Sequence, residues 1–187
     1  MFLIFKRLFD IFLAISLIIF LFPLYIITAL IIFLQDRATP IFKQLRVGYG
    51  GEKFMFYKFR SMPLKTANVE SHEKDKLTIT PFGKFIRRSN LDELPQFFNV
   101  LRGDMSFIGP RPPIPSQENL ITLRKENKSI FLKPGLTGWA QVNSYDNMPE
   151  EKKAQFDGEY ASRISLKMDL LILFKTVIYF TKKPPTY

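Results

Sequence analysis

The chain has 187 residues and carries 27 Lys and Arg against 17 Asp and Glu, a formal net charge of +10. It contains no cysteine and one histidine, His72, which excludes disulfides and argues against a zinc site or a histidine-based triad. This length accommodates one domain, or one domain with an appendage. The basic excess favours an anionic partner: nucleic acid, anionic lipid headgroups or a phosphorylated substrate.

The first 34 residues are strongly apolar, and Asp10 is the only charged side chain between Leu8 and Leu34. No small-residue cleavage site follows the run, so a signal peptide is not expected. Pro23 stands in the middle of the run and is expected to bend a helix there. Basic residues flank the run on both sides and give no inside–outside asymmetry. They are Lys6, Arg7, Arg37, Lys43 and Arg46.

Two topologies satisfy this pattern. In the first, residues 1–36 form a re-entrant membrane helix that bends at Pro23 and leaves on the side it entered, with residues 37–187 as a cytosolic domain docked on the membrane face. Each limb would be about 16–22 Å long at roughly 1.5 Å per residue, too short for a hydrocarbon core about 30 Å thick. In the second, the run spans the bilayer as one kinked anchor. The sequence leaves both open.

Residues 41–60 have the pattern of a β-hairpin, with strands over Ile41–Val47 and Lys53–Arg60 and a glycine-rich turn between them. Lys58 and Arg60 are two residues apart, so a strand would present both cations on one face. The alternative is a solvated edge strand with its usual basic residues.

Two helices are expected next. A polar stretch over residues 63–79, which contains His72, is expected to form a loop. Thr80 then fits the N-cap of a helix over Pro81–Arg88, with proline at its first position. Apolar residues at helical spacing predict a second helix over Leu91–Leu101.

An acidic pair, Asp92 and Glu93, occupies the second and third positions of this second helix if Asn90, a good helix-capping residue, is its N-cap. The free backbone N–H groups and the dipole of a first helical turn favour negative charge and also attract a phosphate. A phosphate beside two carboxylates needs a cation between them, so the pair predicts a Mg²⁺ site. The alternative is that Asn90 and Glu93 form an ordinary capping box.

Arg111 lies between prolines in the loop over residues 103–113. The prolines restrict the backbone, and a guanidinium held rigidly suits bidentate contact with phosphate. The alternative is a proline-rich turn with a surface arginine. Further on, Pro134-Gly135 predicts a type II turn. Trp139 is expected either in the core or as an anchor at headgroup level.

Three more helices are expected, over residues 116–128, 149–163 and 166–180. The second places Asp157 and Tyr160 on one face. The third is too short and too charged to span a bilayer, so it lies either in the membrane interface or buried on the domain. The predicted fold is α+β and mainly helical: a re-entrant helix, a small hairpin, and a compact cytosolic helical domain with interfacial amphipathic helices.

Five motifs occur in order along nearly the whole chain. They are Lys6-Arg7-Leu8-Phe9-Asp10, Tyr57-Lys58-Phe59-Arg60-Ser61-Met62, Leu91-Asp92-Glu93-Leu94-Pro95-Gln96, Gly103 to Pro112, and Lys133 to Val142. Each is weak alone. In this order the chain resembles the bacterial sugar transferase family, and within it the small monotopic polyprenol-phosphate phosphoglycosyl transferases.

The resemblance implies an enzyme that transfers a sugar 1-phosphate from a nucleoside-diphosphate sugar, with UDP sugars as expected donors, to polyprenol (undecaprenyl) phosphate. It implies Mg²⁺, and a place on the cytosolic face of the bacterial inner membrane at the first membrane step of glycoconjugate assembly. By analogy, Asp92 is the nucleophile that forms an aspartyl phosphosugar, and Glu93 assists; both are expected metal ligands. The predicted substrate- and phosphate-binding residues are Lys58, Arg60, Arg87, Arg111, Asp157 and Tyr160.

Two positions depart from the family pattern: Phe22 precedes the membrane proline where serine is frequent, and Ser144-Tyr145-Asp146 stands where Gly-Arg-Asn is frequent. A non-enzymatic alternative is a membrane-anchored adaptor that binds anionic lipid through its basic surface. Nucleic acid is not expected as a partner, because aromatic and basic residues are not interleaved as a stacking platform requires. The sugar and a homo-oligomeric state are left open.

Overall fold

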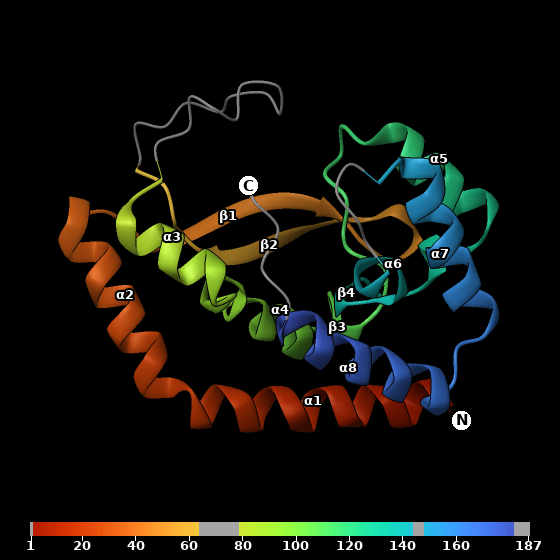
Figure 1. Cartoon of the computed structure of the whole chain (residues 1–187), viewed down its shortest axis with the longest axis horizontal. Coiled ribbons are helices and arrows are strands. Elements are labelled where there is room, and N and C mark those ends of the chain that lie inside the picture. The colour runs from red at the N-terminus through yellow and green to blue at the C-terminus, as the bar shows by residue number, and fades with distance from the viewer. Residues whose placement is uncertain (1, 64–78, 144–147, 182–187) are drawn as a thin grey trace.

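The computed structural model describes residues 2–63, 79–143 and 148–181 (Figure 1). The described chain is mainly helical with two small two-stranded sheets, which confirms the predicted fold class at this level. The predicted position of His72 and the departure over residues 144–146 lie outside the described residues.

The apolar N-terminal run forms two helices, α1 (Phe2–Phe20) and α2 (Phe22–Asp36), with an angle of 63° between them. Pro23 lies in the first turn of α2, where its missing N–H is tolerated, so the chain breaks just before it. The predicted bend is confirmed. Among the described helices none is long and apolar enough to cross a bilayer alone, whereas this bent pair meets that criterion together.

Charged residues of α1 dock it on the rest of the molecule. Arg7 donates through Nη1 and Nη2 to the carbonyls of Val100 (2.6 Å) and Leu101 (2.9 Å) at the end of α4 (Gln96–Arg102). The buried Asp10 accepts the Phe107 N–H at 3.1 Å. The N-terminal half of α1 is therefore part of the folded body, with its polar groups turned inward.

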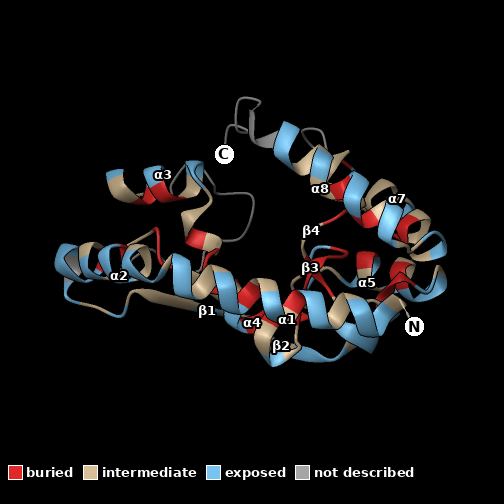
Figure 2. Ribbon diagram, turned by 90° about the horizontal axis from the view of Figure 1, so that it is seen from below, coloured by how far each residue is buried: buried red, intermediate tan, exposed pale blue. Residues whose placement is uncertain are grey.

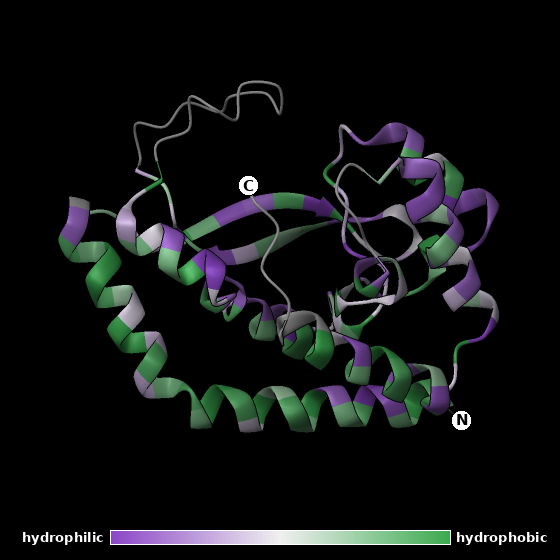
Figure 3. Ribbon diagram, in the orientation of Figure 1, coloured by the Kyte–Doolittle hydropathy of each residue, from purple (hydrophilic) through white to green (hydrophobic). Residues whose placement is uncertain are grey.

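The outward faces of α1, α2 and α8 (Leu166–Thr181) are apolar and exposed (Figures 2 and 3). The exposed side chains include Leu3, Ile4, Phe5, Leu8, Phe12, Phe22, Ile26, Leu30, Leu166, Leu170 and Phe174. The opposite face of α8 buries Ile172 in the core. Lys6 of α1 donates to Asp169 of α8 at 2.6 Å, and Figure 1 shows α2 turning away from α1.

The predicted hairpin is confirmed as β1 (Ile41–Val47) and β2 (Lys53–Phe59), paired antiparallel. The other edge of β2 is satisfied by one side chain of α4. Asn99 donates through Nδ2 to the Met55 carbonyl at 2.7 Å and accepts the Tyr57 N–H at 3.1 Å. The fully buried Asn99 amide thus pairs with two backbone groups of β2, as a neighbouring strand would, and fixes the strand that carries Lys58.

A second sheet was not predicted: β3 (Ser106–Ile108) pairs parallel with β4 (Gly135–Thr137). The type II turn predicted at Pro134-Gly135 is wrong, because Gly135 has no positive φ and begins a strand. Gly135 instead lets its backbone lie close to that of Gly109, because a Cβ on Gly135 would lie 2.1 Å from the Gly109 nitrogen. The two glycines let these backbones pack without side chains between them.

Gly109→Ala is expected to lower the free energy of unfolding by about 2–4 kcal/mol, because its Cβ would lie 2.2 Å from the Lys133 carbonyl oxygen. Gly50→Ala is the control: nothing lies within 4 Å and only the positive φ is strained, a cost of about 1 kcal/mol. Urea unfolding of both variants measures the difference. Equal losses would contradict this account of the sheet.

The helix predicted over Leu91–Leu101 is two elements, the 3₁₀ turn η3 (Leu91–Glu93) and α4. Pro95 has no N–H to donate to the Leu91 carbonyl, and in an α-helix its ring would clash with that carbonyl. The chain therefore forms a tighter 3₁₀ turn before Pro95. Asn90 adopts a left-handed conformation and makes no side-chain cap, so the predicted N-cap is wrong.

Three other helices are close to expectation: α3 (Pro81–Arg88), capped by Thr80, α5 (Glu118–Glu126) and α7 (Glu150–Ser162). The short helices η4 (Ser129–Phe131) and α6 (Trp139–Val142) were not predicted. Trp139 packs against the main core and donates to Glu159 at 3.0 Å, which favours the core role over a headgroup anchor. A second, smaller core joins α2, β2, α3 and η3 through Ile32, Phe59, Ile86 and Leu94.

Candidate functional site

Asp92 and Glu93 lie together in η3, at the junction of α3 and α4. The predicted placement of the pair in the first turn of an α-helix is wrong, and phosphate binding there stays a prediction. The turn has three residues, and its Glu93 and Leu94 N–H groups donate within it, to Asn90 (3.1 Å) and Leu91 (3.3 Å). Charge at this site is therefore balanced by side chains from other segments.

Asp92 is 8% exposed, and burial raises the pKa of its carboxyl to about 6. The neighbouring Glu93 contributes to this raised pKa as a smaller cause, while Lys58 and Arg87 oppose the rise. Burial lowers the pKa of Lys58, and Asp92 opposes that change. Above pH 6 the site thus holds a carboxylate with little hydration, balanced by nearby cations.

Three of the predicted cations converge on this pair from different segments: Lys58 from β2, Arg87 from α3 and Arg111 from the loop after β3. Arg111 Nη2 donates to Glu93 Oε1 at 3.0 Å. Arg87 donates through Nε to Ser61 Oγ at 2.7 Å, which orients the guanidinium. Lys58 Nζ lies 5.1 Å from the centre of the Phe42 ring. Three of the four predicted cations are thus brought together, and Arg60 is the exception.

The remaining predicted residues lie elsewhere. Arg60 is buried and its Nη2 donates to the Ala38 carbonyl at 3.4 Å. Asp157 and Tyr160 are each 1% exposed. Asp157 accepts from Arg124 Nη2 at 2.6 Å, and the Tyr160 hydroxyl donates to Asp169 at 2.6 Å. These contacts hold α7 to α5 and α8, so the structure gives Asp157 and Tyr160 a packing role rather than the predicted contact with substrate.

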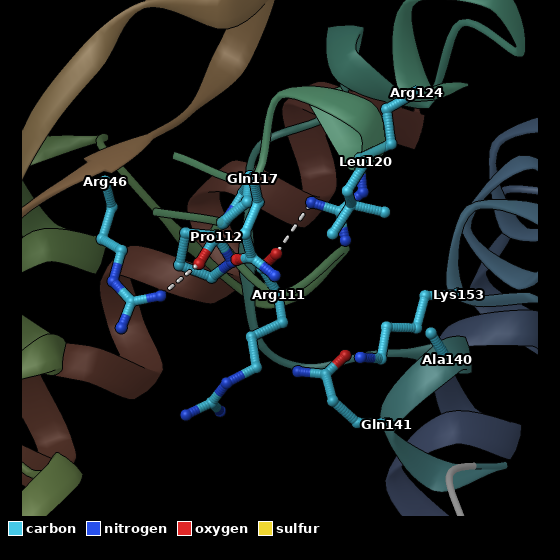
Figure 4. Close-up of a pocket in the computed structure, with 10 residues that line it drawn as sticks. Arg46, Arg111, Pro112, Gln117, Leu120, Arg124, Ala140, Gln141 and Lys153 are labelled. Atoms are coloured by element: carbon cyan, nitrogen blue, oxygen red, sulfur yellow. Dashed lines mark hydrogen bonds between the residues drawn. The ribbon is translucent and has the colours of Figure 1, made fainter. Parts of the chain in front are cut away.

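A cavity of about 270 Å³ is lined in part by Arg111, the partner of Glu93 (Figure 4). Its polar lining consists of Arg46, Arg111, Arg124, Lys153, Gln117 and Gln141, and no carboxylate is among the described residues that line it. Arg46 donates to the Pro112 carbonyl at 3.0 Å, and Arg124 to that of Arg111 at 2.8 Å. The arginines thus stiffen the proline-rich loop. Arg111 lines the cavity and also contacts Glu93. One anionic ligand with two charged groups can therefore contact both the cavity and the acidic pair.

Arg46, Arg124, Gln141 and Lys153 were not predicted as site residues. Burial and the neighbouring Arg111 lower the pKa of Arg46 to about 10, a sign of cations held close together. One signal was present in the sequence. Gln117 and Arg124 are seven residues apart, which places them on one face of a helix. Arg46 was predicted only as a flank of the apolar run.

The acidic pair offers two of the ligands that a Mg²⁺ ion needs. Among the described residues no group of three or more His, Cys, Asp or Glu is placed to hold a metal ion. Asp92 and Glu93 supply adjacent carboxylates, and Mg²⁺ commonly takes one or two carboxylates and completes its shell with phosphate and water. The pair therefore fits Mg²⁺ together with a phosphorylated ligand, and the metal stays a prediction.

The pKa of Asp92, about 6 in the folded protein against an ordinary value of 3.8, means that folding disfavours the ionised carboxyl. Asp92→Asn is expected to raise the free energy of unfolding at about pH 7.5 by about 1–3 kcal/mol. The gain should shrink as pH falls from about 6 toward about 4, because wild-type Asp92 then becomes protonated in the folded protein. Thermal unfolding across this pH range measures it, and a variant less stable at every pH would contradict it.

The acidic turn, its ring of cations and the cationic cavity form a candidate site for a phosphorylated ligand, on a body with exposed apolar helices. Residues 1–183 match the model of the family described as bacterial sugar transferase. The chain belongs to this family, as its motifs indicated.

Relatives agree with this assignment. The chain is 39% identical over 184 residues to a UDP-glucose:undecaprenyl-phosphate glucose-1-phosphate transferase of Xanthomonas campestris pv. campestris, covering 92% of this chain and 38% of that protein. It is 40% identical over 185 residues to a UDP-N-acetylgalactosamine-undecaprenyl-phosphate N-acetylgalactosaminephosphotransferase of Aeromonas hydrophila, covering 92% and 42%. It is 38% identical over 172 residues to the uncharacterized sugar transferase EpsL of Bacillus subtilis, covering 92% and 85%. The chain thus spans about two fifths of the first two proteins.

Proposed function

We propose that this protein is a phosphoglycosyl transferase that moves a sugar 1-phosphate from a UDP sugar to undecaprenyl phosphate. The names of the two relatives with stated substrates support this donor and acceptor. The observation that carries the proposal is the buried Asp92 carboxylate among Lys58, Arg87 and Arg111, beside a cationic cavity. That arrangement suits attack by a carboxylate on a diphosphate, whose negative charges must be screened.

In the first step the cavity holds the nucleotide part of the donor, with Arg46 and Arg111 on its phosphates. An Asp92 oxygen attacks the phosphorus that carries the sugar. The bond from this phosphorus to the bridging oxygen breaks, and uridine monophosphate leaves with the electron pair. Asp92 then carries the phosphosugar as an acyl phosphate. Its low hydration favours attack, and the nearby Lys58 and Arg87 offset the developing charge.

In the second step a phosphate oxygen of undecaprenyl phosphate attacks the same phosphorus. The bond to Asp92 breaks, the carboxylate is restored and the lipid-linked diphosphate sugar leaves. Asp92 and Glu93 would hold Mg²⁺, which when bound neutralises phosphate charge during transfer. Because the donor product leaves before the lipid enters, the two substrates use one site in turn, and ping-pong kinetics are expected.

The proposal is tested by release of uridine monophosphate from a panel of UDP sugars, with Mg²⁺ and undecaprenyl phosphate present. One sugar is expected to support turnover, with parallel double-reciprocal lines when both substrates are varied. No release from any donor would refute the proposal. Intersecting lines would retain the activity and overturn the two-step mechanism.

We propose further that α1 and α2 form a re-entrant helix at the inner face of the bacterial inner membrane. The 63° bend and the exposed apolar outward faces support this topology. Since the chain has no cysteine, Phe2→Cys and Pro40→Cys each introduce one reporter. An impermeant maleimide is expected to label both from the cytosolic side in inverted vesicles. Labelling from opposite sides would establish a spanning helix instead.

A further inference from the structure

Tyr25 of α2 reaches the turn that carries the acidic pair. Its hydroxyl donates to the Leu94 carbonyl at 2.5 Å, and Leu94 directly follows Glu93 in the chain. The contact joins residues 69 apart in sequence. It links the second limb of the bent helix pair to the residue that directly follows the acidic pair.

The Tyr25 ring is fixed in the smaller core. Its centre lies 5.9 Å from that of Phe59 in β2 and 6.0 Å from that of Phe98 in α4. Rings at these separations and tilted angles pack favourably and limit rotation. The hydroxyl is therefore presented to Leu94 by three elements at once, and a phenol stays protonated near neutral pH, so it remains a donor.

The acidic turn has little internal support. Asn90 gives it no side-chain cap, and Pro95 supplies no N–H. Its own bonds are the 3.1 Å and 3.3 Å contacts of Glu93 and Leu94. The Leu94 carbonyl accepts from the Phe97 N–H at 3.0 Å as well as from Tyr25, so this oxygen is where α4 and α2 both hold the turn.

We infer that Tyr25 is a positioning residue, through which α2 sets the geometry of the turn carrying Asp92 and Glu93. For catalysis this rests on the proposed function; for the turn itself it rests on the contact alone. Because the outward face of α2 is apolar and exposed, a lipid environment that shifts α2 is expected to act on the acidic pair through this hydroxyl.

The test is Tyr25→Phe, which removes one oxygen and keeps the ring packing. In lipid nanodiscs kcat is expected to fall roughly tenfold or more, since small misplacement of a reacting group is costly. The KM for the UDP sugar should change by less than about twofold, since the cavity residues are untouched. Hydrogen exchange should speed up in peptides covering residues 91–98. Tyr49→Phe is the matched control, because Tyr49 is exposed and packs on Phe131 away from the turn.

The outcomes separate this inference from the proposed function. Faster exchange at residues 91–98 in a protein whose wild type has no transferase activity would support the positioning role and overturn the proposed function. Unchanged kcat and exchange in an active protein would overturn the inference alone. A fall in kcat with exchange faster throughout the chain would also overturn it, since that is general destabilisation.

Discussion

Asp92→Asn is expected to lower kcat by about 10³-fold or more while the protein stays folded and still binds the UDP sugar. The amide keeps the size of the carboxylate and removes the nucleophile, so an interaction used only in the transition state is lost. Release of uridine monophosphate measures the loss, and binding of the donor to the variant by calorimetry shows that the cavity is intact.

The matched control is Glu52→Gln, the same change at an exposed carboxylate in the hairpin turn, which should leave turnover unchanged. Glu93→Gln is expected to be strongly impaired as well, because Glu93 holds Arg111 and is a candidate Mg²⁺ ligand. Normal turnover in Asp92→Asn would show that Asp92 is not the nucleophile. A membrane-anchored adaptor would instead show no turnover in the wild type, and its lipid binding would be unchanged in Asp92→Asn because it depends on total charge rather than on this pair.

Arg124→Met is expected to cost the fold about 3–5 kcal/mol, because it leaves the Asp157 carboxylate buried without its counter-ion. The two side chains meet at 2.6 Å and are 5% and 1% exposed. Burial raises the pKa of Asp157, and the Arg124 guanidinium opposes this. Arg124 also holds the Arg111 carbonyl, so the variant should loosen the loop that joins the cavity to Glu93. Urea unfolding measures the stability.

The control is Arg102→Met. The Arg102–Asp104 pair is 3.5 Å apart and its arginine side chain is 60% exposed, so its loss should cost no more than about 1 kcal/mol. Adding Asp157→Leu to Arg124→Met should recover part of the lost stability, because the orphaned charge is gone. Equal losses of stability in Arg124→Met and Arg102→Met would show that the buried ion pair stabilises the fold no more than the exposed one.

Local elements were predictable where periodicity and turn residues act over short distances. Thr80-Pro81 marks the start of α3, Pro149 the start of α7, and the glycines after Val47 the hairpin turn. The bend beside Pro23 follows from one missing N–H. The sheet of β3 and β4 could not be predicted, because strands of three residues show no alternation and pair across a long separation.

The site was predictable in its residue types and less so in its geometry. The motif containing Asp92 and Glu93 was identified, but its helical cap was not formed, since Pro95 forces a tighter turn. Asp157 was predicted as a substrate-binding residue, whereas the structure pairs it with Arg124. Its partner Arg124 is 33 residues away, and a pair at that separation leaves no pattern in a single sequence. The Tyr25 contact is hidden for the same reason.

The most direct measurement is the mass of the purified protein after incubation with Mg²⁺ and its UDP sugar, without undecaprenyl phosphate. The account predicts an added mass equal to the sugar phosphate, located on Asp92 by peptide mapping, absent from Asp92→Asn, and lost when undecaprenyl phosphate is added. An active protein that forms the lipid product but never carries this adduct would contradict a covalent step on Asp92.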